Sequence, residues 1–505
     1  MNLNIILKEK KKFFEFFIFI SLISVSLLFL FTNYQKLGVF ADDIGTIYFL
    51  KKISTLKELV IYSHNWDAAR DLHLIWQKLF IILSKSEITQ KLHWYQILIY
   101  SINALILYLI LKGFKITKNI SYVCVVFFLF FPLYSEVVFW THAFTMVLIS
   151  TTFFLLFILV NIKLSEELET TKKYKYELLS FLFLLLNLFT YEQSIVISLF
   201  IIVLREFNLI KSKKKINKDN YLSIFLYFSL IILFSYYKLY EAGTFTKNSQ
   251  LYFTGSKLSN NDQIIKNIIH GYGLFIYNLI YLNLDNFNLI KNQKVLAVII
   301  TVLLLVMLFF NQKRKEIINF KLISLKIFIC FMCYTLSLLP LYIHYISDRH
   351  FYIPSIFAII GISFILDSFL NIIGKRKLSN IIFNSIICLF LLNVMLNFDT
   401  QRNQYIENYR IKYNFYEELS QIDNIKNNKY IILNNFPDLY KKTIFFAHEQ
   451  REAMRLKFEN EDLPLVIKNI YSKKENSIYI NFIEINNNEI RYKINDRKIT
   501  KTTKS

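Results

Sequence analysis

Two adjacent acidic residues, Asp42 and Asp43, lie in the stretch Val39-Phe40-Ala41-Asp42-Asp43-Ile44, shortly after the first long apolar run. Like charges this close raise each other's pKa, so the pair is costly to hold together. A carboxylate in such a position can act as a general base, taking a proton from a hydroxyl group as that group attacks. The alternative interpretation is an acid-rich turn or helix cap, for which Asp is well suited.

Other ionisable residues stand at the edges of later apolar runs. Polar groups at helix ends near one face suggest a site at a membrane boundary. Arginine suits bidentate contacts with phosphate, so Arg70 and Arg349 are candidates for binding an anionic group. The whole predicted set on this face comprises Asp42, Asp43, Arg70, Asp71, His73, His93, Glu136, Glu192, Asp348, Arg349 and His350.

Several of these residues have a plainer interpretation. Glu136 and Glu192 can simply end helices, as acids at a membrane edge often do. His93 stands beside Trp94 and is then a residue of the interfacial aromatic belt. All four tryptophans are expected to anchor at the headgroup level: Trp66, Trp76, Trp94 and Trp140.

The segment around residue 348 also allows more than one interpretation. Asp348 and Arg349 can form a local ion pair that ties a tight loop. His344, Asp348 and His350 are metal-ligand types, but their loose spacing is a weak signal for a metal site. The identity of a metal, if one binds, is unknown from the sequence.

The composition sets the class of protein. Of 505 residues, 54% are hydrophobic and only 19% are charged, and the mean hydropathy is +0.38. Many apolar runs approach the length of a spanning helix, which indicates a polytopic α-helical membrane protein. The net charge of +22 comes from short Lys and Arg clusters between apolar runs, which favours cytoplasmic loops and lipid headgroups over nucleic acid. The four cysteines lie inside apolar runs and are expected to pack as small hydrophobes.

The apolar runs and basic clusters together predict roughly eleven spans, with the N-terminus cytoplasmic and the C-terminus exoplasmic. An amphipathic helix on the membrane surface is expected where Leu72, Ile75, Trp76, Leu79, Phe80 and Leu83 recur at helical spacing. Residues 268–284 are expected to be interfacial or re-entrant. The predicted spans are 13–32, 94–111, 120–131, 144–162, 178–190, 195–204, 221–240, 295–310, 322–342, 353–370 and 381–396.

The composition becomes polar after the last span. A strand is predicted at 430–433, a helix at 443–458, and a β-hairpin where 478–482 and 490–494 alternate around Asn486-Asn487-Asn488. We therefore predict two domains: a membrane domain over 1–397 and a small exoplasmic α/β domain over 398–505.

The chain resembles the GT-C superfamily of polyprenyl-phosphate-sugar-dependent glycosyltransferases, and within it the bacterial relatives of the TPR-containing O-mannosyltransferases. The likeness covers about residues 1–370 and lies in the order of its motifs, although the TPR repeats are absent. In order, these are Asp42-Asp43, Ala69-Arg70-Asp71-Leu72, His93-x-x-Gln96-x-x-x-Tyr100, Pro132-x-x-x-Glu136-x-Val138-x-Trp140, Tyr191-Glu192-Gln193 and Arg349-x-x-Tyr352-Ile353-Pro354-Ser355.

This resemblance implies a GT-C-like helix bundle in a bacterial plasma membrane and an inverting transfer of sugar from a lipid phosphate to a glycan, lipid or protein. Asp42 or Asp43 would be the base, and Arg349 and Arg70 would bind the donor phosphate. Glu136 and Glu192 would orient the base or a divalent cation, with His93 and Asp348 in support.

Two other functions remain open. A polysaccharide flippase or transporter would also be basic and polytopic, but it should carry paired discontinuous segments and charges inside its spans. The sequence interpretation finds neither. An O-antigen polymerase or ligase is closer in chemistry and is expected to rely on large loops between late helices.

Overall fold

The computed structural model places part of the chain, and the account below concerns that part. It describes helical and connecting residues 23–24, 43–67, 70–84, 88–131, 135–140, 143–165, 170–213, 218–245, 317–338, 348–373 and 377–420. It also describes the strand residues 430–434, 439–440, 443–444, 465–468, 477–486, 489–494 and 501–502.

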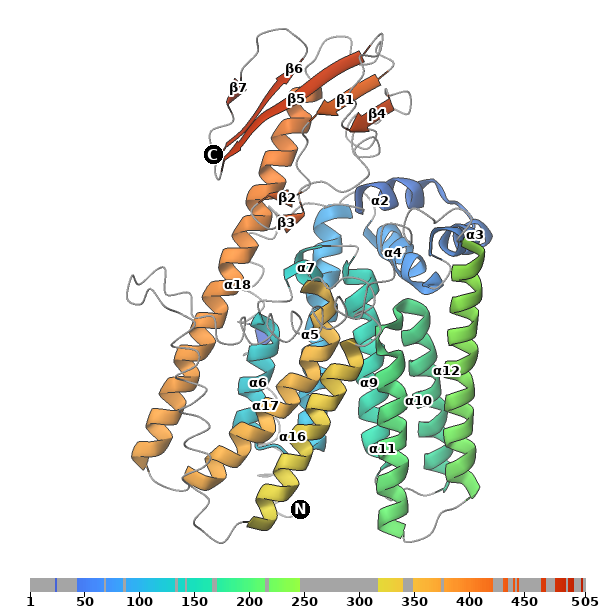
Figure 1. Cartoon of the computed structure of the whole chain (residues 1–505), viewed down its shortest axis with the longest axis vertical. Coiled ribbons are helices and arrows are strands. Elements are labelled where there is room, and N and C mark those ends of the chain that lie inside the picture. Colours follow the sequence, from blue (N-terminus) through green and yellow to red (C-terminus); the bar gives the residue numbers. More distant parts are fainter. Residues whose placement is uncertain are drawn as a thin grey trace, which may run out of the picture.

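A bundle of long apolar helices forms the body of the molecule (Figure 1). Helices suit apolar surroundings because they satisfy every backbone polar group within one segment. The bundle helices are α5 (Ile88–Gly113), α6 (Lys118–Phe130), α9 (Ile149–Leu164), α10 (Thr170–Thr190), α11 (Ile195–Lys213), α12 (Lys218–Phe245), α16 (Ile317–Leu338), α17 (Tyr352–Ile373) and α18 (Lys377–Ser420).

Three described helices are long and apolar enough to cross a membrane: Lys91–Gly113, Phe144–Leu164 and Arg349–Leu370. Their length and composition confirm a helical fold and agree with the prediction of a membrane protein. The count of eleven spans stays a prediction. The predicted spans 13–32, apart from residues 23 and 24, and 295–310 lie outside the described residues, as does the re-entrant segment 268–284.

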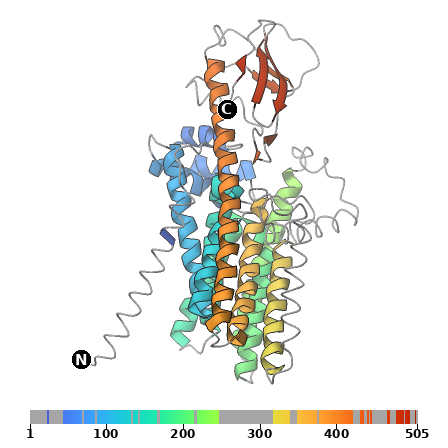
Figure 2. The same cartoon turned by 90° about the vertical axis from the view of Figure 1, so that its left-hand side faces the viewer.

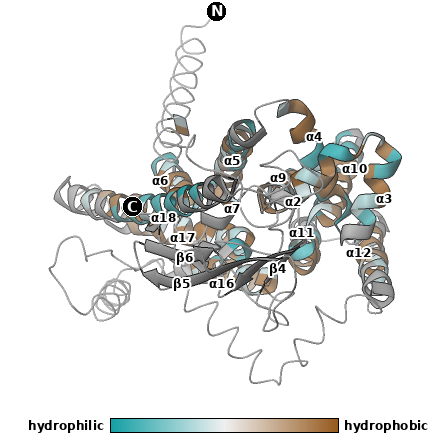
Figure 3. Ribbon diagram, turned by 90° about the horizontal axis from the view of Figure 1, so that it is seen from above, coloured by the Kyte–Doolittle hydropathy of each residue, from teal (hydrophilic) through white to brown (hydrophobic). Residues whose placement is uncertain are grey.

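Short helices cover one end of this bundle, which we call the upper end; the opposite end is the lower end (Figures 1 and 3). They include α2 (Asp43–Lys52), α3 (Leu56–Asp67), α4 (Asp71–Ser84) and α7 (Ser135–Phe139). Single turns lie there too: the π-turn η3 (Phe144–Leu148) and the 3-10 turns η4 (Glu192–Ser194) and η8 (Asp348–Phe351).

Local caps fix two of the short helices. Thr55 and Glu58 form a capping box at the start of α3, in which the Glu58 carboxylate accepts from the backbone N–H groups of Ser54 and Thr55. The ammonium of Lys78 on α4 donates to the carbonyls of Leu50 and Ile53, at 2.5 and 2.8 Å, and so caps the end of α2. Burial lowers the pKa of Lys78.

Helix α4 confirms a helix in the predicted place, but it buries a different face. Its buried residues are His73, Leu74, Gln77, Ile81 and Ser84. Trp76 is half-buried and donates through its indole N–H to Thr190 of α10 at 3.3 Å. The predicted apolar face is therefore split, with part of it packed on the bundle and Leu79 and Leu83 exposed.

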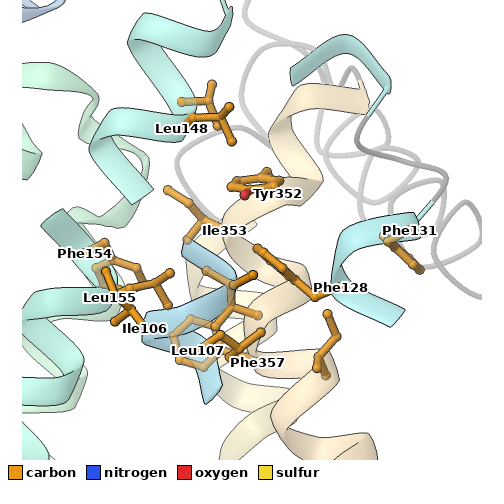
Figure 4. Close-up of a cluster of buried hydrophobic side chains, with 14 of the residues drawn as sticks. Ile106, Leu107, Phe128, Phe131, Leu148, Phe154, Leu155, Tyr352, Ile353 and Phe357 are labelled. Carbon is orange, nitrogen blue, oxygen red and sulfur yellow. The ribbon is translucent and has the colours of Figure 1, made fainter. Parts of the chain in front are cut away.

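Aromatic and aliphatic side chains fill the centre of the bundle (Figure 4). Tyr352, at the start of α17, packs against the rings of Tyr100 and Phe128 at 6.1 and 5.4 Å between centroids. The Tyr100 hydroxyl donates to the carbonyls of Phe128 and Leu129, so its polar end is satisfied inside the core. This packing fixes the first turn of α17 and the η8 turn that precedes it.

Several helices run further than the sequence predicts, and three of them show this at one end by eight residues or more. Helix α10 begins at Thr170 instead of 178, α11 continues to Lys213 instead of 204, and α18 continues to Ser420 instead of 396. Charged residues at these ends led to early termination in the prediction, whereas helices carry charged turns readily where partners or water are available. Figure 2 shows α18 passing along the whole bundle and beyond its upper end.

Because α18 is continuous from 377 to 420, the predicted domain boundary at 397/398 falls inside a helix. After α18 the chain forms a five-stranded sheet with the strand order β4-β1-β5-β6-β7 and a two-stranded sheet of β2 and β3. The antiparallel pair of β5 (Ser477–Asn486) and β6 (Glu489–Ile494) covers the predicted hairpin, with a register shift between Phe482 and Glu484. The other strands are β1 (Tyr430–Asn434), β2 (Leu439–Tyr440), β3 (Thr443–Ile444), β4 (Leu465–Lys468) and β7 (Lys501–Thr502).

The helix predicted at 443–458 is wrong at its first two residues, which form β3, and its remainder lies outside the described residues. A separate α/β domain in this part of the chain stays a prediction.

Candidate functional site

Arg70 and Glu192, which are 122 positions apart, meet at the upper end of the bundle. Arg70 immediately precedes α4, and Glu192 opens the η4 turn between α10 and α11. The guanidinium donates from Nε to Oε2 at 2.9 Å and from Nη2 to Oε1 at 2.8 Å. This is the bidentate arrangement in which an arginine recognises a carboxylate most specifically.

Two further contacts orient the Arg70 guanidinium. It lies over the Tyr191 ring, 5.0 Å from the centroid, and its Nη1 donates to the sulfur of Met146 at 3.6 Å. The Arg70 and Glu192 side chains remain 28% and 20% exposed. The pair is therefore held in place while still reaching the surface of the upper end.

Arg349 is placed by a different set of contacts. It belongs to η8, and its guanidinium lies 4.7 Å from the centroid of the Trp140 ring. The Trp140 side chain is buried, so the prediction of Trp140 as a headgroup anchor is wrong. Trp94 is 53% exposed, which suits the predicted anchoring position.

His93 lies in the interior and not in an aromatic belt. It is buried on α5 and its Nδ1 lies 2.5 Å from Oε1 of Gln96, one helical turn away. Gln96 donates from Nε2 to the backbone carbonyl of Trp140 at 3.3 Å, which fixes the orientation of its amide. Because Oε1 of Gln96 can only accept, Nδ1 of His93 carries the hydrogen of this contact.

Gln193 links the two turns that carry the candidate charges. Its Nε2 donates to the carbonyl of His350 at 2.5 Å and to that of Ser337 at 3.4 Å. The side chain is 1% exposed. Sequence reasoning used Gln193 only as the third residue of a motif and gave it no role of its own.

The remaining predicted site residues are described only in part. Asp42 lies outside the described residues. Asp43 begins α2, Glu136 lies in α7 and Asp348 begins η8; for these three the structure describes the backbone alone. Helix α7 contacts both η8 and η3, and α2 contacts α4, so the three backbone positions belong to the upper end.

No group of three or more His, Cys, Asp and Glu residues within the described ranges is arranged to hold a metal ion. His344, one of the three predicted metal-ligand types, lies outside those ranges.

Next to Arg70, a second polar cluster joins α3, α4 and α12. Nδ1 of His64 lies 3.5 Å from the Asp71 carboxylate. The Tyr237 hydroxyl donates to the same carboxylate at 3.1 Å, and Ser63 donates to the backbone carbonyl of Asp71 at 2.5 Å. Because Asp71 is the residue after Arg70, these contacts fix the backbone at the start of α4, from which the Arg70 side chain extends.

A third polar cluster lies near the lower end and was missed by the sequence interpretation. Arg205 of α11 donates to Glu206 at 2.8 Å, to Asn161 of α9 at 2.8 Å and to Glu177 of α10 at 3.2 Å. It also donates to Ser223 of α12 at 2.6 Å. The predicted spans 178–190 and 195–204 exclude Glu177, Arg205 and Glu206, whereas the structure places all three inside the helices α10 and α11.

Of the predicted residues, the structure therefore brings Arg70 and Glu192 into contact and places Arg349 over the Trp140 ring. It links the buried His93 to the Trp140 carbonyl through Gln96. The sequence interpretation gave no role to Gln96, Gln193 or the lower-end cluster. No protein-family model and no curated protein matches this chain.

Proposed function

We propose that the chain is an integral membrane glycosyltransferase of the GT-C type that transfers a sugar from a polyprenyl-phosphate donor to a glycan, lipid or protein acceptor. The observation that carries the proposal is the convergence of Arg70, Glu192 and Arg349 at one end of an apolar helix bundle. The backbone positions of Asp43 and Glu136 belong to the same end. Cations beside carboxylates at a membrane boundary suit a lipid-phosphate substrate.

Arg349 is the residue we assign to the donor phosphate. The Trp140 ring lies against one face of its guanidinium, and the planar fork of N–H donors in an arginine matches the geometry of phosphate oxygens. Arg70 is bound in bidentate fashion by Glu192. We therefore assign the Arg70–Glu192 pair to shaping the site.

In the proposed reaction, the acceptor oxygen attacks the anomeric carbon as Asp42 or Asp43 takes its proton. The bond between the anomeric carbon and the phosphate oxygen breaks, and the lipid phosphate leaves as an anion that Arg349 stabilises. A single displacement inverts the anomeric configuration, because the carboxylate activates the acceptor and does not attack the sugar. We further propose that the upper end faces the exoplasm, as the basic clusters predict.

A transporter would need a polar path within the bundle, and the buried lower-end cluster is the observation in its favour. Every nitrogen of the Arg205 guanidinium already donates to a protein group, which favours a structural role. An O-antigen polymerase or ligase remains the alternative enzyme, and it would use the same upper-end groups.

The test is transfer from a radiolabelled polyprenyl-phosphate sugar in purified membranes. Replacing the base by Asn removes the proton acceptor while keeping its shape, so one of Asp42→Asn and Asp43→Asn should lower turnover by a factor of about 10² to 10⁴. Donor binding should survive in both variants because the phosphate is bound elsewhere. Glu58→Gln, which changes an exposed acid at the same end, is the matched control and should retain activity. Full activity in both single variants and in the double variant, at equal protein level, would refute the mechanism.

A further inference from the structure

The side chain of Gln193 connects three elements that are far apart in the sequence. It extends from η4, donates to the carbonyl of His350 in η8, and reaches the carbonyl of Ser337 in the last turn of α16. Glu192 is the residue before Gln193, and Arg349 is the residue before His350. One buried amide therefore ties the turn that carries the acid to the turn that carries the candidate phosphate-binding cation.

The chemistry of these contacts requires a neutral donor. The Ser337 carbonyl lies in the last turn of α16, where carbonyl oxygens lack helical N–H partners. The residue four positions after His350 is Pro354, which has no N–H to donate to the His350 carbonyl. The amide of Gln193 supplies N–H groups to both carbonyls without bringing a charge into a buried place. Its Oε1 atom makes no hydrogen bond within the described part of the chain. The hydrogen bonds of this side chain are therefore those that Nε2 donates.

We propose that Gln193 is a positioning residue that sets Arg349 in η8 at a fixed place relative to the Arg70–Glu192 pair, so that the upper end binds an anionic lipid phosphate. The inference rests on the proposed function for the identity of the ligand. It assigns to Gln193 the alignment of the two turns, while Trp140 supports the Arg349 ring face. Loss of this link would let η8 shift and would weaken phosphate binding.

Two variants separate this role from simple packing. Gln193→Leu keeps a similar volume and cannot donate. Gln193→Glu keeps the shape and can donate to His350 only when protonated, because a carboxylate would face a carbonyl oxygen. Burial and this hydrogen bond favour the protonated acid, so the pKa of the introduced acid is raised in the folded state. The stabilising contact is then present at low pH and lost as pH rises through the raised pKa.

The first measurement is thermal unfolding of the purified full chain between about pH 5 and about pH 8. The unfolding midpoint of Gln193→Glu, relative to the wild type, should rise as the pH is lowered, whereas the deficit of Gln193→Leu should stay constant. Gln77→Leu is the matched control, because Gln77 is a buried glutamine of the upper end whose amide makes no hydrogen bond within the described residues. Equal, pH-independent deficits for Gln193→Glu and Gln193→Leu would overturn the link itself.

The second measurement is binding of radiolabelled undecaprenyl phosphate to the same preparations. Gln193→Leu should bind roughly five- to tenfold more weakly at every pH, as expected for the loss of a hydrogen bond. Gln193→Glu should be equally weak at high pH and should recover at low pH, and Gln77→Leu should bind like the wild type. Wild-type affinity in Gln193→Leu would overturn the positioning role. A wild type that binds no lipid phosphate would overturn the proposed function and the ligand assigned here, while the unfolding data would still decide the link.

Discussion

The molecule contains two clusters with the same ingredients, one at each end of the bundle. At the upper end, Arg70 contacts Glu192 and lies over the ring of Tyr191 at 5.0 Å. At the lower end, Arg205 contacts Glu206 and Glu177, and its guanidinium lies over the ring of Tyr227 at 5.5 Å. The side chain of Arg70 is 28% exposed, whereas that of Arg205 is 2% exposed.

The difference in burial separates two uses of the same chemistry. A buried charge must be fully paired, and the partners of Arg205 come from α9, α10, α11 and α12, so the cluster joins four helices. An exposed pair contributes little to stability and can exchange its contacts with a ligand. We therefore expect variants at the lower end to affect folding and variants at the upper end to affect binding.

The largest predicted effect is on Arg205. Arg205→Leu removes the cation that pairs with the carboxylates of Glu206 and Glu177. Breaking a buried ion pair in this way lowers the free energy of unfolding by about 3–5 kcal/mol. The check is the free energy of unfolding of the purified chain, with Arg410→Leu, at an exposed position of α18, as the control. If Arg205→Leu leaves stability unchanged but abolishes a transport activity, the lower cluster is part of a substrate path and the comparison made above fails.

The sequence predicted the bundle well because apolar runs of spanning length can hardly form anything else. It failed where helices carry charge. The helix α11 was ended at Leu204 because Arg205 and Glu206 follow it, yet those two residues neutralise each other inside the helix. Such pairing depends on Asn161 and Glu177 from other helices, which no periodicity within α11 can reveal.

The candidate site was predicted by residue type but not by contact. The motifs identified Arg70, Glu192 and Arg349, because cations and acids at the ends of apolar runs are visible in a sequence. That Arg70 binds Glu192, and that Arg349 lies on Trp140, follows from packing between helices. The spacing of His93 and Gln96, three residues apart on one helix, was the available signal for the buried pair, but it was interpreted as a surface belt.

An intermediate effect is expected for the pair Arg70–Glu192. A double-mutant cycle with Arg70→Ala and Glu192→Ala should give a coupling free energy of about 1 kcal/mol, because the pair is bidentate but partly exposed. Most of that coupling should disappear in about 1 M salt, where screening acts over roughly 3 Å. The same cycle on Arg205 and Glu206 should be larger and should resist salt. Equal salt sensitivity at both ends would mean that burial does not distinguish them.

The smallest effect concerns the cap that holds α3 at the upper end. The pKa of the Glu58 carboxyl is lowered, chiefly by the backbone N–H of Ser54 and then by that of Thr55. A carboxyl with a lowered pKa in the folded state contributes stability at pH values above its ordinary pKa of 4.5, and this stability is lost as the pH falls through the lowered pKa.

At low pH the backbone amides of Ser54 and Thr55 should therefore exchange hydrogen faster, after correction for the intrinsic rate. Glu58→Gln should remove this pH dependence, whereas Lys57→Gln, at the exposed neighbouring position, should keep it. An unchanged pH dependence in Glu58→Gln would show that the cap does not rest on the ionised group. The lower-end cluster contains no such exposed, singly held carboxylate, so the amides of α11 around Arg205 should stay protected over the same range.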